Sequence, residues 1–199
     1  MDLKKNASVK TREVVIGAVC LSLSFLLYIF PIWRMPLGGD VTAGSALPLL
    51  LYSYFYGFRK SILYCCSFVL LQFVFGIFFI NVWSILLDYV LPASFLCWPC
   101  VCNKNMSLSS EYHKHKGFFW GVVLYFLFRI FSHTLSGVIF WSNGIDFGIW
   151  QGDLVGGLAW SYSFMYNLLY LLPDTLIVIV LGFIILKNKH LTKVIKKDI

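Results

Sequence analysis

Residues 118–141 read FFWGVVLYFLFRIFSHTLSGVIFW, an apolar run in which Arg129 is the one permanently charged side chain. An α-helix crosses the hydrocarbon core of a bilayer, about 30 Å thick, with about 20 predominantly apolar residues. A membrane β-strand is shorter and alternates apolar with polar residues, which this run does not. The stretch therefore predicts a transmembrane helix.

The rest of the chain has the same character. Of its 199 residues, 59% are hydrophobic and 13% are charged, whereas soluble domains carry about 25% charged residues. Backbone groups in lipid must bond to one another, which favours helices. We predict an all-α integral membrane protein, a single domain over residues 1–199 built as a bundle of six transmembrane helices. The spans are predicted at roughly 13–33, 42–58, 61–80, 82–101, 118–141 and 159–186.

Basic residues predict the orientation of the spans, because cytoplasmic loops retain Lys and Arg. They cluster before the first span, between the second and third, between the fourth and fifth, and after the sixth. The intervening loops hold Asp40, Asp146 and Asp153. Both termini are therefore predicted to be cytoplasmic. Since the net charge of +7 is divided among these loops, it does not indicate a nucleic-acid partner.

The six cysteines do not indicate a disulfide or a metal. Cys97, Cys100 and Cys102 gather near the predicted inner end of the fourth span, in a reducing compartment that disfavours disulfides. A structural zinc site needs a fourth ligand and a closed geometry. We therefore expect ordinary thiols, no metal and no cofactor.

Ionisable residues inside the predicted spans are candidates for function. They are Asp88, Arg129, His133 and Asp174. Such a residue costs about 2.5 to 3.5 kcal/mol on insertion scales, so it normally faces a partner or a wet cavity. Arg129 and His133 share a helical face, which Gly137 and Trp141 continue at the same spacing. The stripe is typical either of a ligand pocket or of a packing face held by an Arg–Asp pair.

Asp174 has a different context, because it directly follows Pro173 within the long sixth apolar segment. Proline is common at the first position of a helix, and acidic side chains stabilise helix N-termini. We therefore expect Asp174 to cap a restart of the helix rather than to contact a ligand.

Two further features favour a pocket near the outer face. Tryptophans gather at the predicted outer ends of spans, namely Trp33, Trp83, Trp141, Trp150 and Trp160. Aromatic belts decorate both interfaces, so this surplus favours a cage for a flat or cationic ligand. The segment MPLGGDVTAGS at 35–45 has a proline and glycines that prevent a continuous helix. It is either a lid or a plain connecting loop.

Ordered blocks along the chain resemble the thiamine-specific substrate-binding (S) components of energy-coupling-factor (ECF) vitamin transporters. Each block alone is weakly specific, but their order is specific. They are Met35–Thr42, Leu86–Tyr89, His133–Trp141, Tyr162–Asn167 and Leu172–Asp174. The resemblance implies a six-helix S component with a thiamine site near the outer face of a prokaryotic plasma membrane.

The resemblance also implies a set of ligand-binding residues. These are Asp88, Tyr89, Arg129, His133, Gly137, Trp141, Tyr162, Asn167 and, by a looser alignment, Trp33. The family usually has Glu at the position of Asp88 and often Lys at that of Arg129, so a thiamine precursor or a related vitamin is an alternative ligand. Because a bare guanidinium repels a cation, we expect Arg129 to orient Asp88 or another site group.

Energy for uptake must come from partners. The chain has no Gly-x-x-x-x-Gly-Lys-[Ser/Thr] phosphate loop, so we predict a non-catalytic transport subunit. The resemblance implies a transmembrane coupling subunit and two ATPase subunits, docked through small residues of the first helix. Ala18 and Ser22 form a small-x-x-x-small pair there, which permits close helix approach.

Two other classes fit less well. An intramembrane enzyme lacks support because the chain has neither a His-Glu-x-x-His nor a Gly-x-Ser-x-Gly motif. A self-sufficient secondary transporter would be expected to show an internal repeat or paired broken helices, and neither is visible. We therefore expect thiamine capture at the outer face, followed by ATP-driven uptake through the ECF partners.

Overall fold

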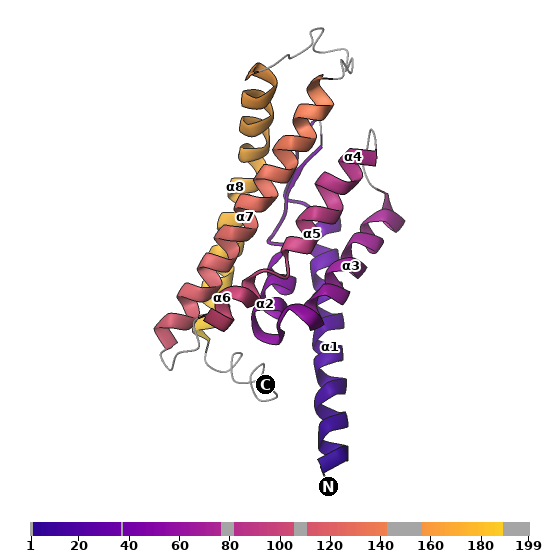
Figure 1. The fold of residues 1–199 in the computed structure, drawn as a ribbon, viewed down its shortest axis with the longest axis vertical. Coiled ribbons are helices and arrows are strands. Elements are labelled where there is room, and N and C mark those ends of the chain that lie inside the picture. The colour runs from indigo at the N-terminus through magenta and orange to yellow at the C-terminus, as the bar shows by residue number, and fades with distance from the viewer. Residues whose placement is uncertain (1, 37, 77–81, 106–110, 143–156, 189–199) are drawn as a thin grey trace.

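The computed structural model describes residues 2–36, 38–76, 82–105, 111–142 and 157–188. It is mostly helical (Figure 1). The elements in chain order are α1 (Asp2–Ile29), β1 (Trp33–Arg34), β2 (Asp40–Val41), α2 (Leu47–Tyr56), α3 (Phe58–Phe75), α4 (Val82–Ile85), the π-helix η1 (Leu86–Val90), α5 (Leu91–Phe95), α6 (Pro99–Asn105), α7 (Glu111–Ser142) and α8 (Gly157–Lys187).

Within the described residues, five helical segments are long and apolar enough to cross a bilayer. They are Thr11–Ile29, Phe58–Phe75, Val82–Cys102, Lys116–Ile139 and Gly157–Lys187. Large apolar side chains such as Leu70, Leu127 and Val180 remain exposed along them. An apolar surface of this kind is suited to lipid. The chain thus has the fold class of a helical membrane protein, and these five segments correspond to five of the six predicted spans.

The second predicted span, at 42–58, differs from the structure. Its helix, α2, has 10 residues and is therefore about 15 Å long, half the thickness of the hydrocarbon core. Gly44 adopts a positive φ of 84° just before it, and β2 and a turn take up the preceding residues. Nearly all of α2 is buried, against α1, α3, α6, α7 and α8. The segment forms a core helix.

The segment between α1 and α2 also departs from an all-helical fold. Residues Trp33–Arg34 and Asp40–Val41 form a short antiparallel hairpin in which Arg34 lies opposite Asp40. The amide of Met35 donates to the carbonyl of Gly39 across the turn at 2.9 Å. We call residues 33–45 the hairpin segment. It contains the whole stretch, residues 35–45, whose proline and glycines predicted a break in the helix.

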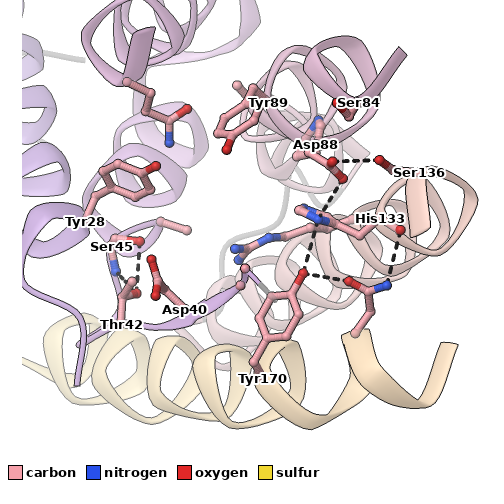
Figure 2. Close-up of a pocket in the computed structure, with 18 of the residues that line it drawn as sticks. Tyr28, Asp40, Thr42, Ser45, Ser84, Asp88, Tyr89, His133, Ser136 and Tyr170 are labelled. Carbon is pink, nitrogen blue, oxygen red and sulfur yellow. Dashed lines mark hydrogen bonds and ion pairs between the residues drawn. The ribbon is translucent and has the colours of Figure 1, made fainter. Parts of the chain in front are cut away.

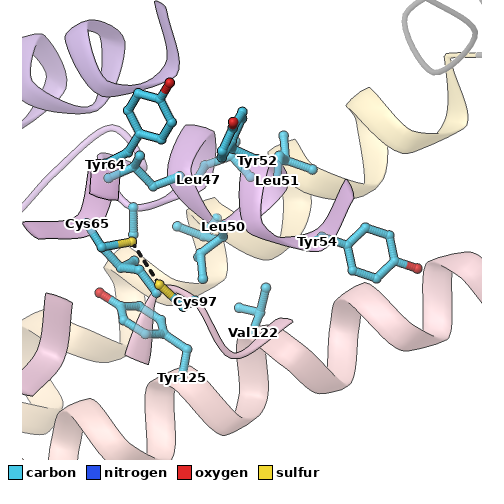
Figure 3. Close-up of a cluster of buried hydrophobic side chains, with 14 of the residues drawn as sticks. Leu47, Leu50, Leu51, Tyr52, Tyr54, Tyr64, Cys65, Cys97, Val122 and Tyr125 are labelled. Atoms are coloured by element: carbon cyan, nitrogen blue, oxygen red, sulfur yellow. Dashed lines mark hydrogen bonds between the residues drawn. The ribbon is translucent and has the colours of Figure 1, made fainter. Parts of the chain in front are cut away.

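The core of the bundle surrounds α2 (Figure 3). Leu50 of α2 is fully buried, and Tyr52 packs edge-on against Tyr64 of α3. Below them the Cys97 thiol donates to the Cys65 sulfur, 3.3 Å away. All six cysteines are free thiols. No group of three potential metal ligands occurs in the described part of the chain.

Close helix packing in this core depends on glycine. A Cβ atom added at Gly121 of α7 would lie 2.7 Å from the Cα of Pro99, at the start of α6. Real Cβ atoms do not approach backbone atoms this closely, so α6 and α7 would have to separate. At Gly157, the start of α8, no atom of another described residue lies within 4 Å of the same position.

We predict that Gly121→Ala lowers the free energy of unfolding by about 1–3 kcal/mol, as expected for overpacking. Gly157→Ala is the matched control, because it makes the same helix-favouring change in open space. Thermal unfolding of the purified protein in detergent measures both. A Gly121→Ala variant that unfolds at or above the temperature of the wild type would contradict this packing.

Candidate ligand-binding site

A cavity of about 200 Å³ lies between the hairpin segment and the helices α1, α3, η1, α5, α7 and α8 (Figure 2). Its lining is partly polar. Six residues of the predicted ligand-binding set line it, namely Asp88, Tyr89, Arg129, His133, Gly137 and Asn167. Residues far apart in the sequence therefore meet at one cavity, and the polar stripe of α7 faces it.

Of the other members of the predicted set, Trp33 and Tyr162 are not among the residues that line this cavity. Trp33 is in β1 and 53% exposed. Tyr162 stacks on Tyr166, a lining residue, with the ring centroids 6.2 Å apart. The backbone of Trp141 belongs to the last turn of α7, but its side chain lies outside the described residues, as does all of Trp150.

A π-helical turn brings Asp88 and Tyr89 to the cavity together. Neighbouring residues of an α-helix diverge by about 100°, and the wider turn of η1 reduces that angle. The carbonyl of Leu87 within η1 accepts a hydrogen bond from the Ser132 hydroxyl of α7. Single π-turns often occur at functional sites. The sequence predicted both side chains at the site but not the π-turn that turns them the same way.

Asp88 is held by α7. The Ser136 hydroxyl donates to its Oδ2 at 2.6 Å, and its Oδ1 lies 3.2 Å from Nδ1 of His133. The Asp88 side chain keeps 26% of its surface exposed. A carboxylate accepts up to about four hydrogen bonds, so Asp88 retains acceptor capacity for a ligand.

The hydrogen bonds around His133 determine its tautomer. The Asn167 amide nitrogen donates to the carbonyls of Ser163 (2.8 Å) and His133 (3.2 Å), so its Oδ1 must be the acceptor for the Tyr170 hydroxyl at 2.6 Å. The Tyr170 oxygen, 3.2 Å from His133 Nδ1, then accepts from it. Hence Nδ1 carries the proton, since its other neighbour is the Asp88 carboxylate.

The second ring nitrogen of His133 is left for a ligand. Nε2 is buried and has no hydrogen-bond partner among the described residues. Buried polar atoms of native proteins are nearly always paired. In the neutral Nδ1–H tautomer Nε2 is an acceptor, so together with Asp88 it forms a site for a hydrogen-bond donor such as an amino group.

Arg129 pairs with Asp174. Its Nη1 lies 2.8 Å from Oδ2 of Asp174, whose side chain is 1% exposed. The other oxygen of Asp174 accepts from the backbone amide of Thr42 at 3.1 Å and from the Thr42 hydroxyl. Arg129 was expected to orient Asp88 or another site group, but in the structure its ion pair is with Asp174, which does not line the cavity. The Arg129 charge is thus neutralised inside the protein.

The expectation that Asp174 caps a restart of the sixth helix was wrong. α8 continues through Pro173 from Gly157 to Lys187. Asp174 therefore lies in mid-helix, where its carboxylate faces α7 and the hairpin segment. Burial of an unpaired carboxylate is expensive, which explains why three donors meet on it.

The hairpin segment rests on α8 at the cavity. The Tyr166 hydroxyl donates to the carbonyl of Gly38 at 2.9 Å. Gly39 has a φ of 93°, and an added Cβ would lie 2.6 Å from the Tyr170 ring. Within the segment, the partly buried carboxyl of Asp40 lines the cavity, and burial raises its pKa while Arg34 acts in the opposite direction.

Sequence reasoning missed several residues of the site. Tyr28, Gln72 and Ser136 line the cavity but carry no distinguishing motif. Tyr166 and Tyr170 were detectable, because with Asp174 they recur every four residues on one face of α8. That polar stripe is the counterpart of the stripe on α7 that begins with Arg129.

The geometry defines a helical membrane protein with an internal polar cavity for a small ligand. Residues 14–194 match the family model described as Thiamine transporter protein (Thia_YuaJ). The chain belongs to this family, as its motifs had indicated.

Comparison with solved structures agrees on the fold. A structure of ThiT from Listeria monocytogenes superposes with a TM-score of 0.70 at 18% sequence identity, over 91% of this chain and 96% of that chain. No curated protein sequence matches the chain significantly.

We predict that Arg129→Met lowers the free energy of unfolding by about 3–5 kcal/mol, because it leaves the buried Asp174 carboxylate without its counter-ion. Arg59→Met, the same change at an exposed position, is the control and is expected to stay within about 0.5 kcal/mol of wild type. Thermal unfolding in detergent compares them. Equal stability of the two variants would contradict a structural role for this ion pair.

Proposed function

We propose that this chain captures thiamine at the outer face of the plasma membrane as the S component of an ATP-driven ECF transporter. Membership of the thiamine transporter family supports the ligand. The observation that carries the proposal is the cavity, in which the paired Arg129 leaves Asp88 as an available countercharge beside a free acceptor, Nε2 of His133.

Thiamine matches this arrangement group by group. Its thiazolium ring is a permanent cation, for which a carboxylate and aromatic faces are suitable partners. Its pyrimidine carries an exocyclic amino group that donates two hydrogen bonds. Asp88 and Nε2 of His133 are acceptors for that amino group, and the Tyr89 ring is an aromatic surface in the cavity lining.

The remaining predicted residues divide by their surroundings. The Asn167 amide is engaged with Ser163, His133 and Tyr170, so we assign it the role of fixing the His133 tautomer. We keep Trp141 as a stacking residue because it follows Gly137 by four positions on α7. Trp33 and Tyr162 lie outside the cavity lining and have no contact role in this proposal.

We propose that both termini are cytoplasmic. In Figure 1 the start of α1, the start of α7 and the end of α8 lie toward the same end of the bundle. Five long segments alone would leave the termini on opposite sides. The hairpin segment and α2 together return the chain from the end of α1 to the start of α3, and so replace a full sixth span.

ATP hydrolysis is assigned to partner subunits. The chain has no phosphate-binding loop motif, and the family resemblance implies a transmembrane coupling subunit with two ATPases. Ala18 and Ser22 are exposed on α1, and the Ser22 hydroxyl bonds back to the Ala18 carbonyl at 2.9 Å. With that hydroxyl engaged, the pair is a small, weakly polar surface suited to helix docking.

We predict that the purified protein binds thiamine at submicromolar concentration and that Asp88→Asn weakens binding by about 100-fold or more, the effect of losing a charged partner in a partly buried site. Calorimetry in detergent measures this. Glu13→Gln removes an equal charge from an ion pair with Lys60, outside the cavity lining, and is expected to bind as the wild type does.

Absence of binding to thiamine by the intact wild-type protein would refute the proposed function. Binding of its aminopyrimidine precursor in preference to thiamine would favour the alternative ligand suggested by the short Asp88 side chain. Uptake of thiamine into vesicles by this chain alone would contradict dependence on ATPase partners and favour a secondary transporter.

A further inference from the structure

The cavity has two polar sides. In Figure 2 the Asp40 side chain lies with Tyr28 and Thr42, across the pocket from Asp88 and Ser136. The Asp88 side holds the acceptors already described. The opposite side is built by the hairpin segment with α1 and α3. The sequence marked residues 35–45 as a lid or a connecting loop, but it indicated no ligand contact among them.

Gln72 of α3 is the first sign that this second side takes part in binding. Its side chain lines the cavity, is 7% exposed, and forms no hydrogen bond with another described residue. An amide that borders the cavity can both donate and accept a hydrogen bond. Gln72 is therefore available to a polar group of a ligand.

Asp40 supplies the charge of this side. It lines the cavity, and its carboxylate forms no hydrogen bond with another described residue. The neighbouring hydroxyls of Thr42 and Ser45 are 3.0 Å apart and bonded to each other, and Thr42 also bonds to Asp174. The Asp40 carboxylate is therefore the available charged acceptor among the described residues of this side.

Free positive charge is lacking among the described residues of the lining. Arg129 is neutralised by Asp174. Arg34, opposite Asp40 in the hairpin, is exposed and does not line the cavity. Phosphate groups are bound by cationic side chains and by several N–H donors, and they carry about two negative charges at neutral pH. A carboxylate beside an amide suits an alcohol instead.

We propose that Asp40 is a specificity-determining residue that selects the free alcohol of thiamine against its phosphate esters. The proposal rests on the proposed thiamine binding. The aminopyrimidine lies at Asp88 and His133, the thiazolium lies between the two carboxylates, and the hydroxyethyl arm donates its hydrogen bond to Asp40. A phosphate on that arm meets the Asp40 charge instead of a donor.

The test is the affinity of purified full-length protein for thiamine and for thiamine monophosphate, each measured by calorimetry. Wild type is expected to favour thiamine by about tenfold or more, because close like charges repel strongly even near a protein surface. Asp40→Asn is expected to reduce this preference by about tenfold, while changing thiamine affinity by less than about tenfold, since Asn also accepts a hydrogen bond.

Two controls isolate the charge of Asp40. Asp40→Glu keeps the carboxylate and is expected to keep the preference for thiamine. Glu13→Gln removes a charge elsewhere and is also expected to keep it. Asp40→Ser provides a second uncharged variant if Asp40→Asn does not purify.

The outcomes separate this proposal from the proposed function. A wild type that binds thiamine but has equal affinity for the phosphate ester overturns the role of Asp40, as does an uncharged variant with an unchanged preference. A wild type that binds neither compound refutes thiamine binding itself.

Discussion

The ion pair between Arg129 and Asp174 is the constraint on which the site depends. Both groups lie inside membrane-spanning helices, where an unpaired charge is expensive. The Asp174 carboxylate is almost fully buried and accepts from Arg129 and from both donors of Thr42. One carboxylate thus joins α7, α8 and the hairpin segment, and these three elements enclose much of the cavity.

Neutralising Arg129 internally changes the electrostatics of the cavity. Among the described residues, its lining contains two carboxylates, Asp40 and Asp88, and one guanidinium, which is already paired. The cavity therefore favours a cation. A series of side-chain interactions runs from Asp88 through His133 and Tyr170 to Asn167. It holds in place the hydrogen-bond acceptors on the Asp88 side of the cavity. This arrangement agrees with membership of the thiamine transporter family, since thiamine is cationic.

Much of the site was predictable because ionisable residues are rare inside membrane spans and therefore mark functional positions. Asp88, Arg129 and His133 are conspicuous in apolar surroundings, and all three line the cavity. Asp40 and Gln72 were not predictable in the same way. Asp40 falls in a predicted loop between spans, where a charged residue is ordinary, and a lone glutamine in a span carries no signal of its own.

The sequence by itself determined the membrane class, the approximate position of five long helices and most of the polar residues at the site, because hydropathy and intramembrane charge are local properties. Only the tertiary structure decided that α2 is a short core helix, that Asp174 pairs with Arg129, and that a π-turn directs Asp88 and Tyr89 together. These features depend on which helices pack against each other. The free energy of each feature is set by burial and by pairing between helices, and not by the residues that are adjacent in the sequence.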